Sequence, residues 1–407
     1  MEKSDFFNEN LTEEERDLYD RQFRLDGWDQ SILKNSKVLI VGVGGLGCEI
    51  AKNLAMVGVG QLDLVDLDIV EHSNLNRQIL FVDARMGEAK AHAAAKMLRK
   101  VNPNITINSY HSSLEGLDPR IYKDCDLIVG GLDSMKARLN LNSQAVRFNK
   151  PLVDAGVAGY HGHVYTIFPG QNACYECYPM VSKDSEEMAA CTVVGVPRKR
   201  VHCVFKGHMA FEDEHGRPPD AKNIDEVNYV QEIANDLVRK HAFDPEFTNG
   251  EIVKIIDHHE PGLITINAVV SSLESHEAIK ILYTLKGNKS LGTPNSQYVI
   301  YNGMSLKFFW IEKKKNLECV QCSDQVQRET IEIAPTSPCE TIIQHLEQKG
   351  YELDPDLFPI LGVLEYDGVR EIELEETPED ANLRTYENVT VSGFISGEIQ
   401  VTVILKP

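Results

Sequence analysis

Along the first part of the chain, short apolar runs alternate with longer stretches in which apolar residues recur at helical spacing. Lys37–Val41 is a largely apolar run of strand length, as expected for a buried parallel strand. A glycine-rich segment follows, then a helix predicted over Cys48–Val57 and a second strand over Gln61–Val65, which ends in Asp66. This order predicts a β–loop–α–β unit.

The same alternation continues through most of the chain as far as Cys322. Helices are predicted over 84–101, 140–148 and 264–285, and strands over 127–129, 152–153, 298–301 and 307–311. Alternating strands and helices predict an α/β fold with a doubly wound, Rossmann-like parallel sheet. The stretch 173–249 is polar and contains one clear helix, Ile224–His241, so we expect it to be inserted into a domain formed by residues 1–172 and 250–322.

The character of the chain changes in residues 325–407. The pattern predicts a strand over Thr330–Ile333, then a helix over Cys339–Gln348 that has Ser337 as its N-cap and is ended by Gly350. Three more strands are predicted over 362–366, 369–374 and 399–405. This β-α-β-β-…-β order is typical of ubiquitin-like β-grasp folds, so we expect a separate C-terminal domain.

Net charge narrows the range of partners. The 407 residues include 41 basic and 62 acidic side chains, a formal charge of −21, and residues 325–407 have 17 acidic and five basic side chains, a net of −12. A chain with this balance is poorly suited to grip a phosphate backbone over a broad surface, so we expect no nucleic-acid partner. The acidic C-terminal stretch indicates either a surface for a basic protein or a solubilising face.

Composition bounds the setting of the protein. With 42% hydrophobic and 25% charged residues, the chain is expected to be globular, neither disordered nor fibrous. No apolar run approaches the ~18 residues of a membrane span, and the segment Met1–Asn10 lacks the apolar core of a signal peptide. Nine cysteines are too few for a disulfide scaffold of this length. We therefore expect a cytoplasmic protein with no membrane partner.

The glycine-rich segment places Gly42, Gly44 and Gly47 in a G-x-G-x-x-G pattern between a strand and a helix. Glycines let the backbone approach phosphate closely, and a helix N-terminus attracts anions. Asp66 ends the next strand, the position from which a carboxylate holds ribose hydroxyls. On these features alone, an NAD-dependent dehydrogenase is the obvious interpretation.

Five further residues favour a nucleoside triphosphate over NAD. Asn74, Arg77 and Gln78 lie just beyond the ribose acid, Lys90 follows them, and Asp133 comes after a later strand. Two cations and a carboxylate suit ATP with Mg²⁺, because Arg77 and Lys90 offset phosphate charge while Asp133 holds the metal. Taken singly, each residue also fits surface charge or a helix cap.

Four cysteines form two hooks of metal-ligand spacing, Cys174-x-x-Cys177 and Cys319-x-x-Cys322. Two such hooks can supply four thiolates in a tetrahedron, which predicts a structural Zn²⁺ site. Because a long stretch of sequence separates the hooks, the site would clamp the insertion to the end of the main domain. The alternatives are four reduced thiols or a redox pair.

The order and spacing of these motifs resemble the adenylation domain of ubiquitin-like modifier activating enzymes, the ThiF/MoeB superfamily. The motifs that carry the resemblance are Tyr19–Gln22, Gly42–Gly47, Asp66–Asp68, Ser73–Gln78, Lys90 and Gly131–Asp133, together with the two cysteine hooks. One departure is Val43, where alanine is commoner in the family. The resemblance to this family covers nearly the whole chain, and the chain also resembles the catalytic subunits of neddylation activating enzymes.

The resemblance implies a role for each site residue. The residues implied to contact ATP are Gly42, Gly44, Gly47, Asp66, Asn74, Arg77, Gln78 and Lys90, with Asp133 holding Mg²⁺. Arg21 would reach a phosphate in the site of a partner subunit. In the eukaryotic enzymes a separate, inactive partner supplies this arginine, whereas here it is on the same chain as the other motifs. The simplest consequence is a homodimer with two complete sites, as in archaeal activating enzymes.

Cys191 is the cysteine with an implied chemical role. Small, flexible residues precede it, and three cations (198–200) follow closely, which favours the thiolate form. The pattern Cys-Thr-x-x-x-x-Pro-Arg resembles the catalytic cysteine of eukaryotic-type activating enzymes, while Cys203 resembles a neighbouring cysteine that is not the nucleophile. The alternative is an unreactive structural thiol at Cys191.

These inferences predict an enzyme with three parts. They are an adenylation domain (1–172 and 250–322), a catalytic-cysteine insertion (173–249) and a ubiquitin-fold domain (325–407) that binds a conjugating enzyme. The enzyme would use ATP to adenylate the C-terminal glycine of a ubiquitin-like modifier, form a thioester on Cys191 and pass the modifier to a conjugating enzyme. The competing interpretations are a sulfur-carrier adenylyltransferase and a silent scaffold that binds a modifier.

Overall fold

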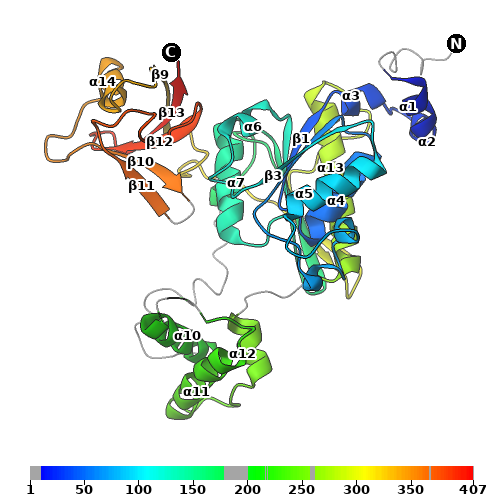
Figure 1. The fold of residues 1–407 in the computed structure, drawn as a ribbon, viewed down its shortest axis with the longest axis horizontal. Helices are drawn as coiled ribbons and strands as arrows, with labels where there is room; N and C mark the ends of the chain where they lie inside the picture. Colours follow the sequence, from blue (N-terminus) through cyan, green and yellow to red (C-terminus); the bar gives the residue numbers. More distant parts are fainter. Residues whose placement is uncertain are drawn as a thin grey trace. The chain divides into compact units, whose positions relative to one another are not determined.

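The computed structural model describes residues 11–177, 200–215, 217, 219–256, 262–365 and 368–406. The chain divides into two compact units, one formed by residues 1–178 and 263–407 and the other by residues 179–262 (Figure 1). The second unit extends past residue 249, where we expected the insertion to end, because it includes helix α12 (Asn249–Ile256).

The larger unit contains an eight-stranded sheet in the order β3-β2-β1-β4-β5-β6-β7-β8. The first five strands along the chain pair in parallel, and the last three continue the sheet in antiparallel. The strands are β1 (Lys37–Val41), β2 (Gln61–Asp66), β3 (Thr106–His111), β4 (Leu127–Gly130), β5 (Leu152–Ala158), β6 (His161–Ile167), β7 (Tyr298–Asn302) and β8 (Lys307–Ile311). The doubly wound fold is confirmed. The pattern does not predict β3, because polar residues fill most of that strand.

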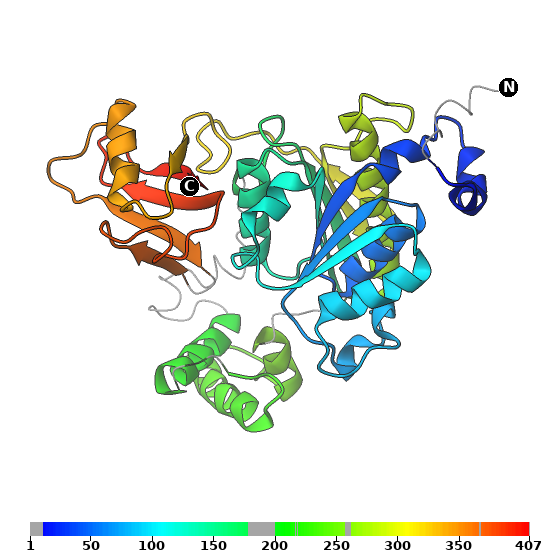
Figure 2. The ribbon, with the colours of Figure 1, turned by 45° about the horizontal axis from the view of Figure 1, so that its top comes forward.

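Helices cover both faces of this sheet, with α4, α5 and α13 on one face and α6 and α7 on the other (Figures 1 and 2). The helices are α1 (Glu13–Leu18), α2 (Asp20–Phe23), α3 (Gln30–Lys34), α4 (Gly45–Met56), α5 (Lys90–Val101), α6 (Pro119–Asp124), α7 (Met135–Arg147) and α13 (Ile264–Leu285), with 3-10 turns η2 (His72–Asn74), η3 (Ile79–Phe81) and η4 (Tyr175–Cys177). No helix in the described ranges is long and apolar enough to cross a membrane.

Several helices begin elsewhere than the pattern predicts: α4 begins at Gly45 instead of Cys48, and two others differ for identifiable local reasons. Helix α5 begins at Lys90 instead of residue 84, because Gly87 takes a φ of +83° and holds the preceding residues in a turn. Helix α7 begins at Met135 instead of residue 140, because the Ser134 hydroxyl accepts a hydrogen bond from the Ala137 amide and caps the helix.

The described residues of the second unit form three helices, α10 (Val201–His215), α11 (Ile224–Lys240) and α12. Its core includes Cys203, Phe211, Val230 and Ile252. Helices α10 and α11 pack closely, since a Cβ at Gly207 would lie 2.7 Å from the Val230 carbonyl oxygen. The helical pattern predicts α11 but neither of its neighbours.

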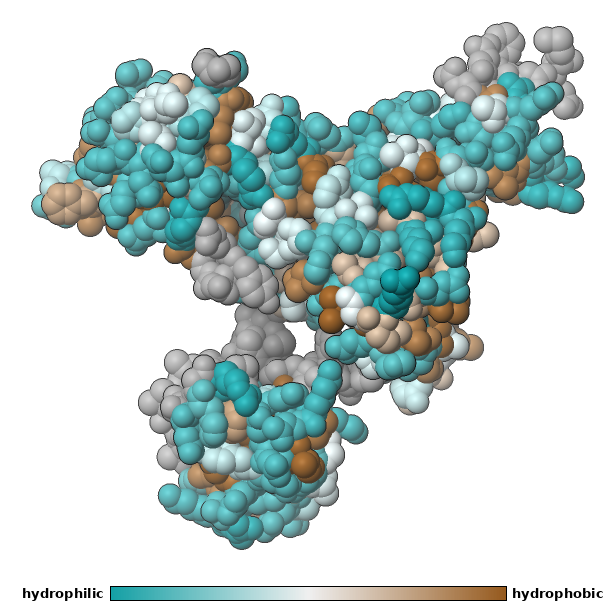
Figure 3. Space-filling model, viewed as in Figure 1, coloured by the Kyte–Doolittle hydropathy of each residue, from teal (hydrophilic) through white to brown (hydrophobic). Residues whose placement is uncertain are grey.

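The C-terminal residues form a five-stranded sheet in the order β11-β10-β12-β13-β9. Its elements are β9 (Gln327–Ile333), α14 (Glu340–Gln348), β10 (Ile360–Glu365), β11 (Gly368–Ile372), β12 (Glu387–Ser392) and β13 (Ile399–Leu405). The predicted strand and helix order is present, with β12 as an additional strand. The face seen in Figure 3 is largely hydrophilic over this part of the molecule.

The prediction that Ser337 caps helix α14 is wrong. The helix begins after Cys339, and no side chain caps it. Instead, the Cys339 amide donates to the Glu376 carbonyl and the Glu340 amide donates to the Leu374 carbonyl. Backbone carbonyls that follow β11 therefore satisfy the amides at the start of the helix, and a side-chain cap is unnecessary.

Candidate functional site

The loops that follow β1, β2 and β4 meet at one edge of the sheet, because the carboxyl ends of parallel strands share an edge. Strand β1 pairs with β2 on one side and with β4 on the other, so the order of winding reverses at β1. Open α/β sheets bind ligands at such a switch point. The topology brings together the segment Gly42–Gly47, Asp66 and Asp133 there.

The glycine segment packs against the loop after β4 with backbone against backbone. Gly42 has a φ of +84°, and a Cβ on it would lie 2.6 Å from the Gly131 carbonyl oxygen. A Cβ on Gly47 would lie 1.9 Å from the Gly42 carbonyl oxygen, whereas one on Gly44 would meet nothing within 4 Å. Helix α4 starts at Gly45 without a side-chain cap. Its first amides are thus suited to an anion approaching past Gly44.

Asp66 is held at the end of β2 by the backbone. Its carboxylate accepts hydrogen bonds from the Val43 amide at 2.7 Å and the Asp68 amide at 2.8 Å. Burial raises the pKa of Asp66, although those amides and the Lys90 ammonium oppose the shift. The carboxylate therefore lies directly beside the glycine segment, where it could accept from ribose hydroxyls.

Lys90 opens helix α5 and is 8% exposed. Its Nζ lies 2.7 Å from Oδ2 of Asp68, whose side chain is 55% exposed. A buried ammonium is thus paired with an exposed carboxylate that solvent screens. A phosphate could take the place of Asp68 as the partner of this cation.

The segment after β2 supplies three more predicted residues. The Asn74 side-chain oxygen accepts from the Glu71 amide, which leaves the nitrogen of the same group as the donor toward a phosphate. Arg77 donates to the Ser73 carbonyl, and its Cδ lies 3.7 Å from the Cβ position of Gly45. Gln78 is 4% exposed, and its Oε1 has no hydrogen-bond partner within the described part of the chain. An unpaired buried acceptor fits a site that receives a donor from a ligand.

Residues that the sequence reasoning missed also border this site. Asn267, in the first turn of α13, is 3% exposed, and its Nδ2 would lie 2.4 Å from a Cβ on Gly45. Asp133, which the sequence analysis did predict as a site residue, is exposed and directly precedes the N-cap of α7. Arg138 on α7 donates to the carbonyl of Leu132. The sequence did contain one signal for the buried residue Arg138: Asp154 is a carboxylate within an otherwise apolar strand, and a buried carboxylate needs a partner.

Arg21 lies on the short helix α2, away from the phosphate edge. Its neighbours are anchored at the C-terminal end of α4. Gln22 donates to the Val57 carbonyl, and a Cβ on Gly58 would lie 2.5 Å from the Tyr19 ring. Arg21 itself is exposed. The glycine segment is at the opposite end of the same helix.

The two cysteine hooks come together, although they are far apart in the sequence. The four sulfurs of Cys174, Cys177, Cys319 and Cys322 are buried and lie within 4.8 Å of one another. The Asn316 amide donates to the Cys177 sulfur and the Gln321 amide to the Cys319 sulfur. Burial and the neighbouring thiols raise the pKa of Cys174. Four such sulfur donors could hold a metal ion.

Cys191 lies outside the described residues. Arg200, one of the cations expected to act on it, is bound elsewhere. Its guanidinium donates to Oε1 of Glu251 at 3.0 Å and lies 3.8 Å over the Phe247 ring. Cys203 is fully buried in the core of its helical unit.

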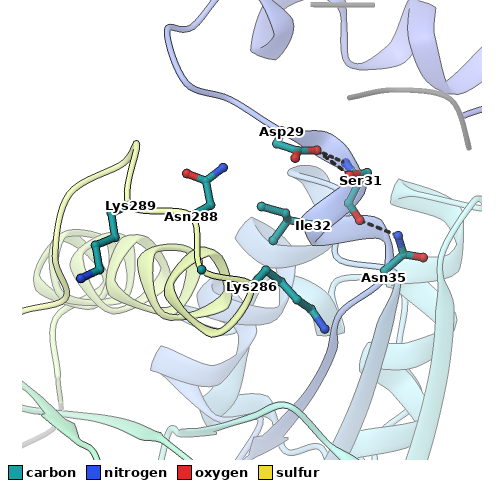
Figure 4. A pocket seen from close by; sticks show the side chains of 8 residues that line it. Asp29, Ser31, Ile32, Asn35, Lys286, Asn288 and Lys289 are labelled. Carbon is teal, nitrogen blue, oxygen red and sulfur yellow. Dashed lines mark hydrogen bonds between the residues drawn. The ribbon is translucent and has the colours of Figure 1, made fainter. Parts of the chain in front are cut away.

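A cavity of about 670 Å³ lies at the other end of β1 (Figure 4). It is lined by α3 and the segment after α13, including Asp29, Asn35, Lys286 and Lys289. Two of the lining residues, Asp29 and Ser31, form the N-terminal cap of α3, because the Asp29 carboxylate accepts a hydrogen bond from the Ser31 amide. Because Asn35 precedes β1 and the glycine segment follows it, this cavity is not the predicted nucleotide site.

The fold is that of a doubly wound α/β protein, and the residues at the β1–β4 edge are suited to bind a nucleotide. Residues 19–322 match the ThiF family, and the chain belongs to that family. The predicted resemblance is thereby confirmed.

Individual proteins that are similar to this chain in sequence are consistent with membership of this family. The chain is 30% identical over 328 residues to the NEDD8-activating enzyme E1 catalytic subunit of Arabidopsis thaliana, covering 76% of this chain and 70% of that protein. It is 31% identical over 350 residues to the protein of the same name from Schizosaccharomyces pombe, covering 78% and 77%. Among solved structures, E. coli MccB with AMPCPP and SeMet MccA aligns with a TM-score of 0.51 at 20% identity, covering 78% of this chain and 75% of that one. This last likeness concerns the fold alone.

Proposed function

We propose that this protein activates a ubiquitin-like modifier with ATP, holds it as a thioester on Cys191 and transfers it to a conjugating enzyme. The observation that carries the proposal is the convergence at one sheet edge of an uncapped helix N-terminus, the buried Lys90 and the carboxylates Asp66 and Asp133. Relatives named as activating-enzyme catalytic subunits, matched over most of their length, support the assignment.

In the first step, a carboxylate oxygen of the modifier's terminal glycine attacks the α-phosphorus of ATP. The bond to the β-phosphate oxygen breaks, and pyrophosphate leaves. A carboxylate is already ionised at neutral pH, so no residue has to remove a proton. The chain contributes position and charge: the amides of α4 hold phosphates, Asp66 holds the ribose, and Lys90 offsets developing charge. Mg²⁺ held by Asp133 would supply further charge neutralisation on the phosphates.

In the second step, the Cys191 thiolate attacks the acyl carbon of the adenylate. A carbon–sulfur bond forms, the bond to the AMP oxygen breaks, and the thiol proton passes to solvent. This exchange keeps the carboxyl group activated after the nucleotide leaves. Cys203 offers a matched control, because it is close to Cys191 in the sequence but is buried in a helical core.

A gel assay tests the thioester. The protein is mixed with a candidate modifier, Mg²⁺ and ATP and run without reductant. We expect an ATP-dependent band that a thiol reductant removes, absent from Cys191→Ala and retained in Cys203→Ala. A band that survives in Cys191→Ala would overturn the assignment of the nucleophile.

We propose further that the protein acts as a homodimer in which Arg21 serves the partner's nucleotide site. Gln22 and Gln30 both donate to the Val57 carbonyl at the C-terminal end of α4. The 12 residues of α4 span roughly 18 Å, so Arg21 lies farther from its own glycine segment than an arginine side chain extends.

Complementation tests this arrangement. Arg21→Ala and Lys90→Met dimers should each be inactive, because both sites lack one residue. After subunits are mixed, mixed dimers have one complete site, and about a quarter of wild-type activity should return. No recovery despite demonstrated subunit exchange would show that Arg21 acts in its own chain.

We propose Zn²⁺ as the metal of the four-cysteine site. Tetrahedral zinc with bonds of about 2.3 Å places its sulfurs roughly 3.8 Å apart. The Cys174 and Cys319 sulfurs are 3.7 Å apart, and those of Cys177 and Cys322 are 3.3 Å apart, which suits a small tetrahedral cation. Reduced, metal-bound thiols suit the reducing cytoplasm, the setting that we expect for this protein.

We propose that residues 325–407 recruit the conjugating enzyme. The domain has a net charge of −12, which complements a basic surface on the partner. Binding should therefore weaken as salt screens the charges. Binding measured at low and at high ionic strength tests this, and an affinity insensitive to salt would contradict an electrostatic contact.

A further inference from the structure

A buried polar cluster links the first cysteine hook to the loop that ends in Asp133. The Tyr175 hydroxyl, within the Cys174–Cys177 hook, donates to Oδ2 of Asp154 at 2.5 Å. Asp154, on β5, is 1% exposed, and the same oxygen lies 3.4 Å from Nε of Arg138 on α7. Arg138 in turn donates to the carbonyl of Leu132, the residue before Asp133. Three elements distant in sequence thus meet in one line of contacts.

The surroundings of this cluster leave the two charged groups little freedom. A Cβ on Gly130 would lie 2.4 Å from Oδ1 of Asp154, and a Cβ on Gly156 would lie 2.7 Å from a guanidinium nitrogen of Arg138. The guanidinium also donates to the Ala155 carbonyl at 3.0 Å. Bare backbone therefore encloses the Arg138–Asp154 pair on both sides, and the orientation of the arginine is fixed.

Charge balance inside the cluster depends on Arg138. Glu274, on α13, is fully buried, and neither of its carboxylate oxygens has a hydrogen-bond partner among the residues described. Within the described part of the chain, Lys313 is another cation near this cluster, and it lies 4.2 Å over the Tyr298 ring instead of against a carboxylate. His163 stands 3.4 Å from Arg138, and burial together with that cation lowers its pKa. Arg138 is thus the positive charge that faces Asp154 directly.

Tyr175, which lies within the first cysteine hook, is the end of this line of contacts that lies farthest from Asp133. The Tyr175 side chain is fully buried, and its backbone amide donates to Oδ1 of Asn142, which is also on α7. Tyr175 therefore contacts α7 through its backbone and, through Asp154, contacts Arg138 on the same helix. A metal that fixes Cys174 and Cys177 would fix the tyrosine between them.

We propose that Tyr175, Asp154 and Arg138 are positioning residues that set the Leu132 carbonyl, and with it Asp133, for Mg²⁺ binding. The inference rests on the proposed function, which assigns Mg²⁺ to Asp133. Arginine is suited to this role because its planar fork holds a carboxylate and backbone carbonyls at the same time. Groups that orient a metal ligand from outside the metal's own shell affect affinity for the ion without touching it.

The test compares two buried tyrosines of the same region. Tyr175→Phe removes the hydroxyl that donates to Asp154, whereas Tyr165→Phe removes a hydroxyl that donates to the Ala173 carbonyl. Both side chains are fully buried, so general destabilisation should be similar. ATP binding to the full-length protein, without modifier, is measured by calorimetry with EDTA and over a series of Mg²⁺ concentrations.

For Tyr175→Phe we expect the Mg²⁺ concentration that half-saturates the effect on ATP binding to rise about tenfold, the lower end of the ~10–100-fold typical of such residues. ATP affinity in EDTA and the bound zinc should not change. Tyr165→Phe should match the wild type in Mg²⁺ dependence. Arg138→Lys, which keeps the charge but not the fork, should behave as Tyr175→Phe.

The outcomes separate the inference from the proposed function. If the wild type binds ATP with a clear Mg²⁺ effect and Tyr175→Phe shows the same Mg²⁺ dependence, the positioning role is overturned and the proposed function stands. An equal loss of Mg²⁺ affinity in Tyr175→Phe and Tyr165→Phe would also overturn the positioning role, since it would reflect destabilisation alone. A wild type that does not bind ATP would overturn both.

Discussion

The packing of the glycine segment predicts that two neighbouring glycines respond differently to alanine. A Cβ on Gly47 would stand 1.9 Å from the Gly42 carbonyl oxygen, so the loop and helix α4 would have to separate by more than an ångström. Such overpacking costs up to about 3 kcal/mol. The better helix propensity of alanine returns about 1 kcal/mol. The net loss of about 2 kcal/mol corresponds to a fall in melting temperature of roughly 4–8 °C for a domain of this size.

Gly44→Ala is the matched control, because a Cβ there meets no atom within 4 Å. Its folding cost is limited to a poorer N-cap residue, below about 1 kcal/mol. The added methyl group nevertheless occupies the approach to the α4 amides, so ATP affinity should fall. The two variants therefore separate folding from binding.

The assay follows tryptophan fluorescence during heating, together with ATP binding by calorimetry. The chain has two tryptophans, Trp28 and Trp310, and both lie in the unit that contains the eight-stranded sheet. We expect Gly47→Ala to melt well below Gly44→Ala, and Gly44→Ala to lose more ATP affinity than stability. A Gly47→Ala protein as stable as the wild type would refute the close approach of the Gly42 carbonyl oxygen to Gly47.

Three further predictions concern the metal, pH and the cysteine segment. Cys322→Ser should lose zinc and melt at a lower temperature, as measured by elemental analysis and calorimetry; a wild-type protein without metal would contradict the assignment. Burial raises the pKa of Asp66, so the folded state should gain stability as pH falls from about 7.5 to about 5. ATP binding should weaken over the same pH range, because it uses the ionised carboxylate. Calorimetry should show that Asp66→Asn lacks both pH dependences. Arg200 follows Cys191 by nine residues and is held by Glu251 and Phe247, so Arg200→Met should loosen the attachment of the segment that carries Cys191. This variant should slow thioester formation but not adenylation; equal slowing of both steps would argue against this role of Arg200.

Elements with a strong local signal could be predicted from sequence. Strand β1 and helix α13 have the predicted bounds, because a continuous apolar run and a long apolar helix face have few alternative interpretations. The two cysteine hooks could be recognised because the cysteines of each hook are separated by only two residues. Helix α10 shows no such periodicity, and its packing depends on Gly207 meeting Val230 of another helix.

Features that depend on contacts between distant residues could not be predicted. The pairing of Arg138 with Asp154 requires α7 and β5 to be placed side by side, and Tyr175 reaches them from a third segment. The start of α14 depends on carbonyls that Leu374 and Glu376 supply from beyond two later strands. Sequence patterns report the face that a residue presents but not the partner that it meets there.

The central claim, adenylation of a modifier's terminal carboxylate, is tested most directly by exchange of labelled pyrophosphate into ATP. The account predicts exchange that requires Mg²⁺ and a modifier with its C-terminal glycine. The exchange should persist in Cys191→Ala, because adenylation precedes the thioester, and should be lost in Asp133→Asn. Exchange that proceeds without a modifier, or equally with one that lacks its terminal glycine, would contradict the account.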